Sequence, residues 1–142
     1  MAHLMSEEDK LLHEFSFYTL SHASPDFIHQ QIVDAYGAQS ANETTKPVRI
    51  LFSLVGLYLY VEEGFTGKEV QLFHQKMARQ KKAWPKLHLP KFRGEIKIGD
   101  VLKAGPGEDR DRMIRLWSED VWKAFQENRT TIIDLIQEYR VH

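Results

Sequence analysis

One apolar stretch limits the folds open to this chain more than any other feature. Residues 50–61 read ILFSLVGLYLYV, and only Ser53 and Gly56 interrupt the apolar run. A helix that is apolar all round must be covered by neighbours on every side. The run is also shorter than the roughly 20 apolar residues that a membrane-spanning helix needs. We therefore expect an all-α domain, a compact helical bundle around a buried central helix, and no membrane partner.

Helical periodicity continues on both sides of the central run. Apolar residues recur at helical spacing in residues 6–21, 25–40, 67–82 and 108–139. The expected helix ends are marked by Ser6, Ser24-Pro25, Thr45 with Pro47, Gly64, and the capping box Thr66-x-x-Glu69.

Gly56, in the middle of the central helix, costs about 1 kcal/mol relative to Ala. The usual reason to accept this cost is the close approach of another helix, and we expect such an approach here. The central helix and the helix after it are joined by a short connection. Helices joined in this way should pack as antiparallel neighbours.

The helical pattern breaks between residues 83 and 106, where prolines and glycines punctuate the chain. The apolar residues of this segment are irregularly spaced: Trp84, Leu87, Leu89, Phe92, Ile96 and Ile98. We expect a long ordered loop pinned by these side chains, with one helical turn at residues 100–103. The long C-terminal helix that follows is either continuous or broken near residues 128–130. Trp122 lies off its apolar face, and we expect it to pack against the loop.

The length of 142 residues suits a single domain, in which we expect residues 1–5 to be disordered. The chain has no cysteine, which excludes disulfides, thiolate metal sites and a cysteine nucleophile. The N-terminus lacks the apolar core of a signal peptide, so we expect a cytoplasmic protein. A formal net charge of −1 by itself favours neither a nucleic-acid nor a membrane partner.

The helix expected over residues 25–40 carries the first candidate site. On a helical projection His29, Tyr36 and Gln39 share one broad face with Ile32 and Val33. Polar groups placed where burial is expected need hydrogen-bond partners. We therefore expect this face to make an internal polar network or to line a small pocket.

Asp34 belongs to the same candidate site, but the projection places it on the opposite side of the helix. In that position it is free to cap or brace a neighbouring segment, and the long loop is one such segment.

Three histidines are predicted to face the interior from three helices, and they make a second candidate site. They are His22, His29 and His74, which together would hold a divalent transition metal of a metal-dependent enzyme. Alternatively, each ring is partly exposed or bonds a backbone carbonyl and no cofactor is bound. No pair spaced as H-x-x-x-H ties two ligands to one helix. Glu62 and Glu63 either add a carboxylate or form the solvated end of the central helix.

The third candidate site is a basic segment, residues 76–97, in which aromatic residues are interleaved. Its candidate nucleic-acid contacts are Lys81, Lys82, Trp84, Lys86, Lys91 and Arg93. Basic groups beside stacking aromatics suit a phosphate backbone and unstacked bases. The alternative is a solvated basic surface balanced by the acidic final helix, with the aromatics anchoring the loop.

The residues therefore favour a non-catalytic domain with a binding or structural role. The metal-dependent enzyme and the nucleic-acid-binding protein remain alternatives. No phosphate-binding loop, dinucleotide fingerprint or serine-nucleophile elbow occurs in the sequence. The final helix offers a face for a homodimer, although a helical face alone does not distinguish core from interface.

The segment HQQIVDAY, followed by Gln39, resembles the H-x-x-x-V-D-A-Y-x-x-Q signature of an uncharacterised bacterial family of small helical proteins. The resemblance continues through residues 54–64, the Trp84-Pro85-x-Leu87 motif, residues 94–101 and residues 117–125. It implies a compact helical domain of unassigned activity. Members of that family often carry an N-terminal cysteine motif and a late histidine pair. This chain has neither, which puts a metal site inferred from relatives in doubt.

Overall fold

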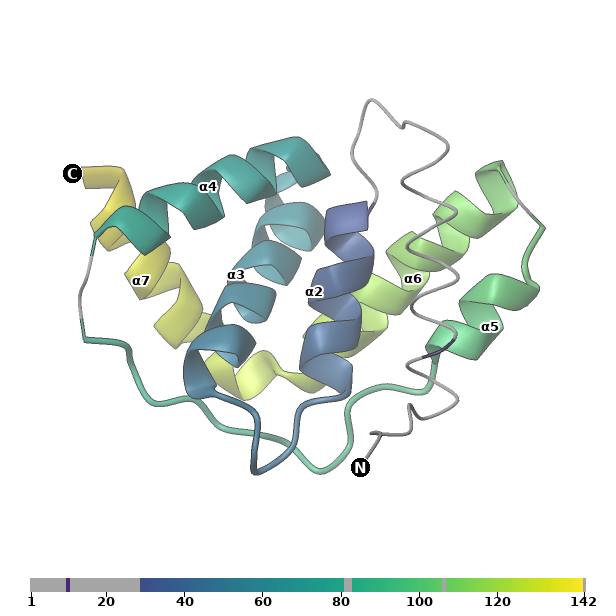
Figure 1. The fold of residues 1–142 in the computed structure, drawn as a ribbon, viewed down its shortest axis with the longest axis horizontal. Coiled ribbons are helices and arrows are strands. Elements are labelled where there is room, and N and C mark those ends of the chain that lie inside the picture. Colours follow the sequence, from purple (N-terminus) through teal and green to yellow (C-terminus); the bar gives the residue numbers. More distant parts are fainter. Residues whose placement is uncertain (1–9, 11–28, 81–82, 106, 142) are drawn as a thin grey trace, which may run out of the picture.

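The computed structural model describes residue 10 and residues 29–80, 83–105 and 107–141. Helices make up all the regular secondary structure in these residues (Figure 1). In chain order they are α2 (His29–Gln39), α3 (Pro47–Glu63), α4 (Gly67–Arg79), α5 (Ile98–Lys103), α6 (Glu108–Ala124), the short 3-10 helix η1 (Gln126–Asn128) and α7 (Arg129–Val141). The predicted all-α fold is confirmed. The helix expected over residues 6–21, its Ser6 cap, the Ser24-Pro25 signal and the disorder expected for residues 1–5 lie outside the described part.

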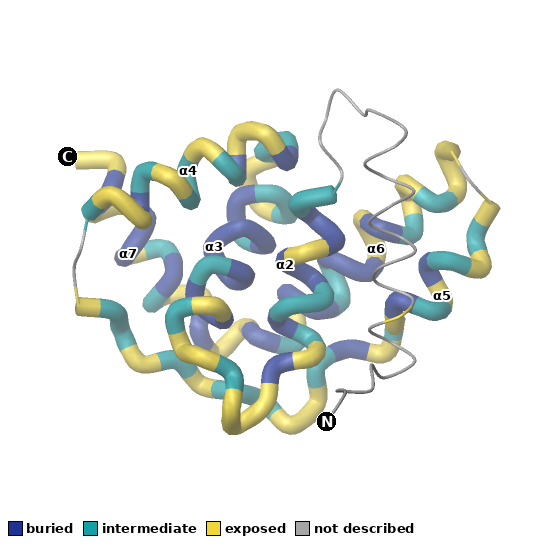
Figure 2. The backbone as a smooth tube through the Cα atoms, viewed as in Figure 1, coloured by how far each residue is buried: buried dark blue, intermediate teal, exposed yellow. Residues whose placement is uncertain are grey.

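The central helix is α3, as its apolar run predicts. It contacts α2, α4, α6 and α7, and most of its length is buried (Figure 2). Leu54, Val55 and Leu59 are completely inaccessible to solvent. Covering a helix on all sides removes its apolar surface from water, which is the main driving force for a fold of this kind. Within the described residues, none of the helices combines the length and apolarity that crossing a membrane requires.

The ends of α3 and α4 follow local rules with one exception. Gly64 ends α3 in the left-handed conformation with φ of 72°. Thr66 and Glu69 form the predicted capping box at the start of α4. Pro47 occupies the first turn of α3, but the expected cap from Thr45 is wrong. Its hydroxyl accepts from the Asn42 amide instead, at 3.0 Å, and so closes the preceding turn.

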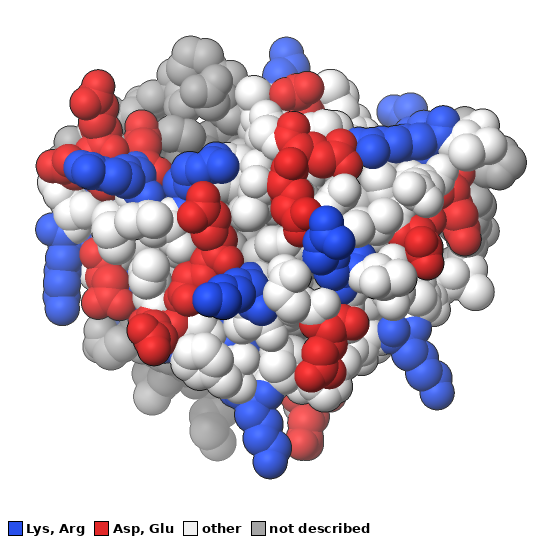
Figure 3. Space-filling view, turned by 180° about the vertical axis from the view of Figure 1, so that it is seen from behind, with Lys and Arg blue, Asp and Glu red and all other residues white. Residues whose placement is uncertain are grey.

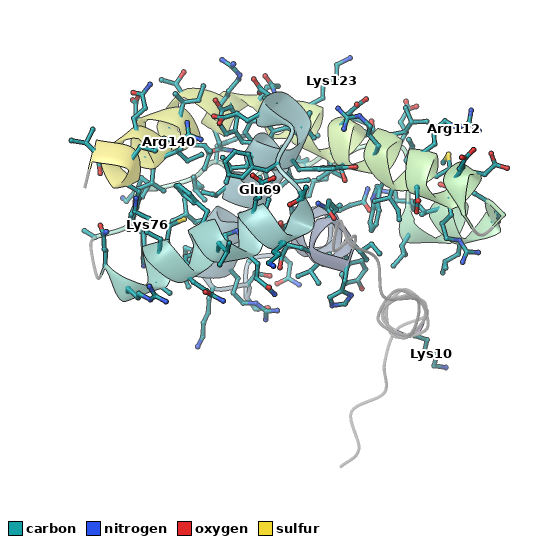
Figure 4. All side chains as sticks on the ribbon, turned by 90° about the horizontal axis from the view of Figure 1, so that it is seen from above. Lys10, Glu69, Lys76, Arg112, Lys123 and Arg140 are labelled. Atoms are coloured by element: carbon teal, nitrogen blue, oxygen red, sulfur yellow. The ribbon has the colours of Figure 1, made fainter. Side chains whose placement is uncertain are left out.

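The helix α4 ends at Arg79 and runs back obliquely over α3, so that His74 reaches Phe52 in the first half of α3 (Figures 1 and 4). The two helices are neighbours, as predicted, and they cross at an angle. In this position α4 contacts both α3 and α2, and it buries Val70 and Met77 against the core. The antiparallel neighbour of α3 is α2, which runs alongside it in the opposite direction (Figure 1).

The segment between α4 and α5 is an ordered connection without regular structure, as predicted. Trp84, Leu87, Leu89 and Ile96 are partly buried against the core. Phe92 is 62% exposed, so the prediction that it anchors the loop is wrong. The expected helical turn is the short helix α5, which buries Ile98 and Val101.

Polar anchors fasten this loop at two points that the sequence pattern did not indicate. The Asn128 side chain donates to the carbonyl of His88 at 2.7 Å and accepts from its amide at 2.6 Å. Oδ2 of Asp120 accepts from the amides of Glu95 and Ile96 at 2.6 and 2.8 Å. Because each anchor satisfies backbone groups, the loop keeps its shape without joining a helix.

The C-terminal segment is broken rather than continuous. The long helix α6 ends at Ala124, the 3-10 turn η1 follows, and α7 begins at Arg129. Phe125 at the break is fully buried, so the chain changes direction around a core side chain. The predicted apolar face is confirmed, since Trp117 and Tyr139 are also fully buried.

Candidate functional site

Two glycines allow α2 and α3 to approach each other closely. A Cβ added to Gly56 of α3 would overlap the carboxyl oxygen Oδ2 of Asp34, on α2. A Cβ added to Gly37 of α2 would lie 2.6 Å from Oγ of Ser53, on α3. Each glycine therefore faces a polar side chain of the other helix. This crossing confirms the close approach that Gly56 predicts.

The carboxyl group of Asp34 lies inside this helix crossing and is 3% exposed. Its Oδ1 accepts a hydrogen bond from Nε2 of Gln30 at 3.1 Å. Burial raises the pKa of Asp34 well above its ordinary value of 3.8, and the bond from Gln30 opposes this effect only in part. Asp34 consequently holds a proton to higher pH than an aspartate on the surface does.

The face of α2 that packs inward is only partly the predicted one: Ile32 is fully inaccessible, as expected. Asp34 was expected to point away from the core towards another segment, and this prediction is wrong. Val33 was expected to face inward, but it is 41% exposed. The buried face is instead centred on Ala35 and Ala38, which are fully inaccessible. Small side chains bring the two backbones closest together, so apolar bulk was a poor guide to this face.

A cavity of about 620 Å³ opens beside the crossing, where α2, α3 and α4 meet. Val33, Val48 and Phe52 supply apolar wall. Polar groups are contributed by Gln30, Asp34, Tyr36, Ser40, Thr45, Arg49, Ser53 and His74. Concave sites of this size, with a few convergent polar groups on an apolar lining, are typical of small-molecule sites.

His74 projects from α4 to the wall of the cavity. Its Nε2 lies 2.8 Å from the carbonyl oxygen of Phe52, and its ring centroid lies 5.1 Å from that of Phe52. Since a carbonyl oxygen only accepts, Nε2 carries the hydrogen and donates it. Burial lowers the pKa of His74, although the bond to Phe52 works in the opposite direction. The ring is therefore neutral at pH 7. It bonds a backbone carbonyl, which is the alternative to metal ligation that we considered for these histidines.

The predicted three-histidine metal site is only partly within the described residues. His22 lies outside them. Among the residues that the structure does describe, no group of three His, Cys, Asp or Glu side chains is arranged to hold a metal ion. His29 is half-buried, and burial lowers its pKa, but it is not part of the cavity lining described above. The metal site stays a prediction.

Gln39 forms the internal polar network that its position predicts, although it does not line the cavity. Its Nε2 donates to the carbonyls of Ile96 at 2.7 Å and Arg93 at 3.3 Å. Its Oε1 accepts from Nε1 of Trp117 at 3.0 Å. One amide thus connects α2, the long loop and α6, and it satisfies a buried indole N–H. Of the four predicted residues, the structure brings Asp34 and Tyr36 to the cavity.

Two residues of the basic segment are engaged within the protein. Arg93 donates from Nε to the carbonyl of Pro90 and from Nη1 to that of Ala41. Trp84 packs edge-on against Phe52, with ring centroids 5.9 Å apart. These contacts agree with the alternative in which the aromatics anchor the loop.

The four lysines among the candidate nucleic-acid contacts differ from Arg93 and Trp84. Lys86 and Lys91 are exposed, while Lys81 and Lys82 lie outside the described residues. On the face opposite to that of Figure 1, acidic and basic side chains intermingle (Figure 3). Nucleic-acid binding stays a prediction.

The two glutamates at the end of α3 form pairs that the sequence pattern did not reveal. Glu62 accepts from Nε1 of Trp122 at 2.6 Å and from Nη2 of Arg129 at 2.7 Å. The Arg129 guanidinium is the main cause that lowers the pKa of Glu62. Glu63 pairs in the same way with Arg140 of α7. The two carboxylates thus fasten α3 to the C-terminal segment.

Trp122 takes part in this junction through α3, and its expected packing against the long loop stays a prediction. Its ring centroid lies 5.9 Å from that of Tyr58, one turn before Glu62 on α3. No sequence spacing could indicate these contacts, because the partners are 60 or more residues apart.

The model of one protein family, described as a family of unknown function (DUF5946), matches residues 9–126. The match covers α2 to α6 and with them the cavity and the Gln39 network. Neither the curated proteins nor the solved structures include a match to the chain.

Proposed function

The chain belongs to the DUF5946 family, whose function is unknown, and we propose that it is a non-catalytic domain that binds a small organic molecule between α2, α3 and α4. The observation that carries this proposal is the cavity of about 620 Å³ at the junction of these helices. Ligand sites typically measure roughly 300 to 1,000 Å³ and bury most of the ligand's surface. A cavity of this size accommodates a molecule as large as an amino acid or a nucleobase derivative.

The walls of the cavity are rigid, which supports a binding role. The crossing of α2 and α3 is tightly packed at Gly37 and Gly56, and α3 is fixed on its other sides by α6 and α7. A site that is formed before the ligand arrives avoids the entropic cost of ordering side chains on binding.

The polar groups of the cavity are held by protein partners, which suits recognition better than proton transfer. His74 uses its Nε2–H on the carbonyl of Phe52, and Asp34 is bonded to Gln30. A general acid must give its proton to the substrate, whereas the Nε2 hydrogen of His74 is already engaged by the Phe52 carbonyl. Groups held in fixed orientation give specificity to a bound molecule.

The experiment is a fragment screen by thermal denaturation on the full chain. A ligand present at 100 times its Kd stabilises the folded state by about 2.7 kcal/mol, which is readily detected. Two tryptophan variants make the screen specific for the cavity. Val48→Trp places an indole in the cavity, whereas Leu72→Trp places one on an exposed position of α4, where Leu72 is 56% exposed.

We expect fragments that stabilise the wild type and the Leu72→Trp variant but not Val48→Trp. Two results would overturn the proposal. One is that no fragment stabilises the wild type. The other is that Val48→Trp, folded and cooperative, responds to every hit as the wild type does.

A further inference from the structure

We infer that the ligand of this cavity is an organic cation, an amphipathic amine whose protonated nitrogen pairs with the Asp34 carboxylate and whose apolar part lies against Val48 and Phe52. This inference rests on the proposed function, because it names the class of molecule that the cavity takes. It is carried by the position of Asp34 in the wall of the cavity.

Asp34 is the acidic side chain of the described cavity lining. The side chain is 3% exposed, so water does little to stabilise a negative charge on it. Among the described residues it accepts one hydrogen bond, from the neutral amide of Gln30, and forms no ion pair with Lys or Arg. A buried carboxylate ordinarily has a cationic partner, and here the protein supplies none within the part of the chain that the structure describes.

The carboxyl group is also fixed in place. Gly56 leaves the space that the Asp34 carboxyl fills, and any larger residue would displace it. The bond from Gln30, one turn earlier on α2, holds Oδ1 from the other side. A pre-oriented acceptor in a poorly solvated site forms charge-assisted hydrogen bonds, which are roughly twice as strong as neutral ones.

The other ionisable groups of the lining do not prevent a cation from binding. His74 on α4 has a lowered pKa and is neutral at pH 7, so it adds no positive charge. Arg49 on α3 is exposed, and water screens its guanidinium more than it screens the buried carboxyl. Tyr36 on α2 offers a neutral phenol. An incoming ligand therefore meets Asp34 as the acidic group of the described lining, with no buried positive charge beside it.

The raised pKa of Asp34 agrees with this reading. In the empty cavity burial penalises the anion, raises the pKa of Asp34 and so favours the protonated carboxyl group. A cationic nitrogen beside it reverses this preference, so that Asp34 ionises and its proton passes to the solvent. Binding of an amine should then release a proton, whereas binding of a neutral or anionic analogue should not.

The test uses sets of three compounds of the same size and shape that differ only in charge. Each set contains an amine, the corresponding alcohol and the corresponding carboxylate, and the sets span aryl-alkyl and branched alkyl skeletons. Affinities are measured by titration calorimetry on the full chain at pH 7.5, with the wild type, Asp34→Asn and Val48→Trp. Two buffers with different ionisation enthalpies report proton release without any substitution.

We expect at least one amine to bind tenfold or more tightly than its alcohol and its carboxylate. Asp34→Asn should remove that advantage, and amine binding should release protons in the wild type. The inference fails if Val48→Trp weakens the binding of alcohols or carboxylates and amines bind no more tightly than these compounds. The proposed function would stand in that case. It also fails if Asp34→Asn binds the amine as tightly as the wild type does. A binding enthalpy that is the same in both buffers, which would mean that no proton is released, contradicts it as well. If no compound of any charge binds, the proposed function fails with it.

Discussion

The side chain of Asp34 on α2 fills the space that the missing side chain of Gly56 leaves on α3. This relationship explains why an aspartate is tolerated in the core and why a glycine interrupts the apolar run of the central helix. The two residues lie 22 positions apart in the sequence, and the space for the Asp34 carboxyl exists because residue 56 has no side chain. The cavity begins beside this pair.

Gly56→Ala should destabilise the protein, because the added methyl group overlaps the Asp34 carboxyl. We expect a loss of about 1–3 kcal/mol, as for overpacking at other tightly packed sites. Chemical denaturation of the variant measures it. Gly105→Ala is the matched control, since nothing lies within 4 Å of a Cβ at that position, and it should change stability by less than about 0.5 kcal/mol.

A second substitution separates this overlap from the general cost of altering α3. Asp34→Ala removes the carboxyl group, so the double variant with Gly56→Ala should be more stable than the sum of the single effects predicts. Additive losses in the double-mutant cycle would show that Asp34 and Gly56 are not coupled.

Asp34→Asn should alter how stability depends on pH. The pKa of Asp34 is raised in the folded state, so this group's contribution is fully present below the ordinary value of 3.8 and is lost as pH rises towards the folded pKa. The loss amounts to at most about 1.4 kcal/mol per pH unit for one proton. Asparagine does not titrate and still accepts from Gln30.

The stability of Asp34→Asn relative to the wild type should therefore increase as pH rises above 3.8. Denaturant unfolding at a series of pH values measures this difference. A difference that stays constant with pH would show that folding does not raise the pKa of Asp34.

Gln39→Leu should destabilise the protein and loosen the long loop. The substitution leaves the indole N–H of Trp117 and the carbonyl of Ile96 without their partner, at a cost of about 2–4 kcal/mol. Proteolysis within residues 83–97 should become faster, because α2 no longer holds the loop. Gln75→Ala on the exposed surface of α4 is the control and should leave both properties unchanged.

Gln39→Glu tests the direction of these hydrogen bonds. A carboxylate still accepts from Trp117, but its second oxygen faces the two backbone carbonyls of the loop. The variant should be clearly less stable than the wild type at pH 7. Stability equal to that of the wild type would mean that the bonds to the loop contribute little.

Glu62→Gln should reduce stability at neutral pH and lose this effect in acid. The pKa of Glu62 is lowered in the folded state, chiefly by Arg129, so its contribution is present above the ordinary value of 4.5 and is lost as pH falls through the folded pKa. Glutamine still accepts from Trp122 but carries no charge. Melting temperatures of the two proteins should converge as the pH falls through the folded-state pKa of Glu62, and a gap independent of pH would contradict the ion pair.

Local rules predicted much of this fold. The apolar run indicated a central buried helix, Gly64 and the capping box marked helix ends, and Gly56 indicated a close helix contact. Each of these signals operates within one helix and its immediate neighbours, so it can be read without knowing the rest of the structure.

The candidate site was only partly predictable, for two physical reasons. The inward face of α2 is set by Ala35 and Ala38, because close packing favours small side chains, whereas apolar bulk pointed to Val33. The cavity and the pairs made by Glu62 and Glu63 depend on how whole helices are placed. Gln39 was the exception, since a polar residue on a mostly apolar face predicts a buried network.

The cavity between α2, α3 and α4 is proposed to bind a small molecule. The most direct test is a methyl NMR titration of valine-labelled protein with the tightest-binding hit of the fragment screen. The account predicts saturable shifts in the methyl groups of Val33 and Val48, which line the cavity, and little change at Val121 and Val141. Shifts confined to valines away from the cavity, or none at saturation, would contradict it.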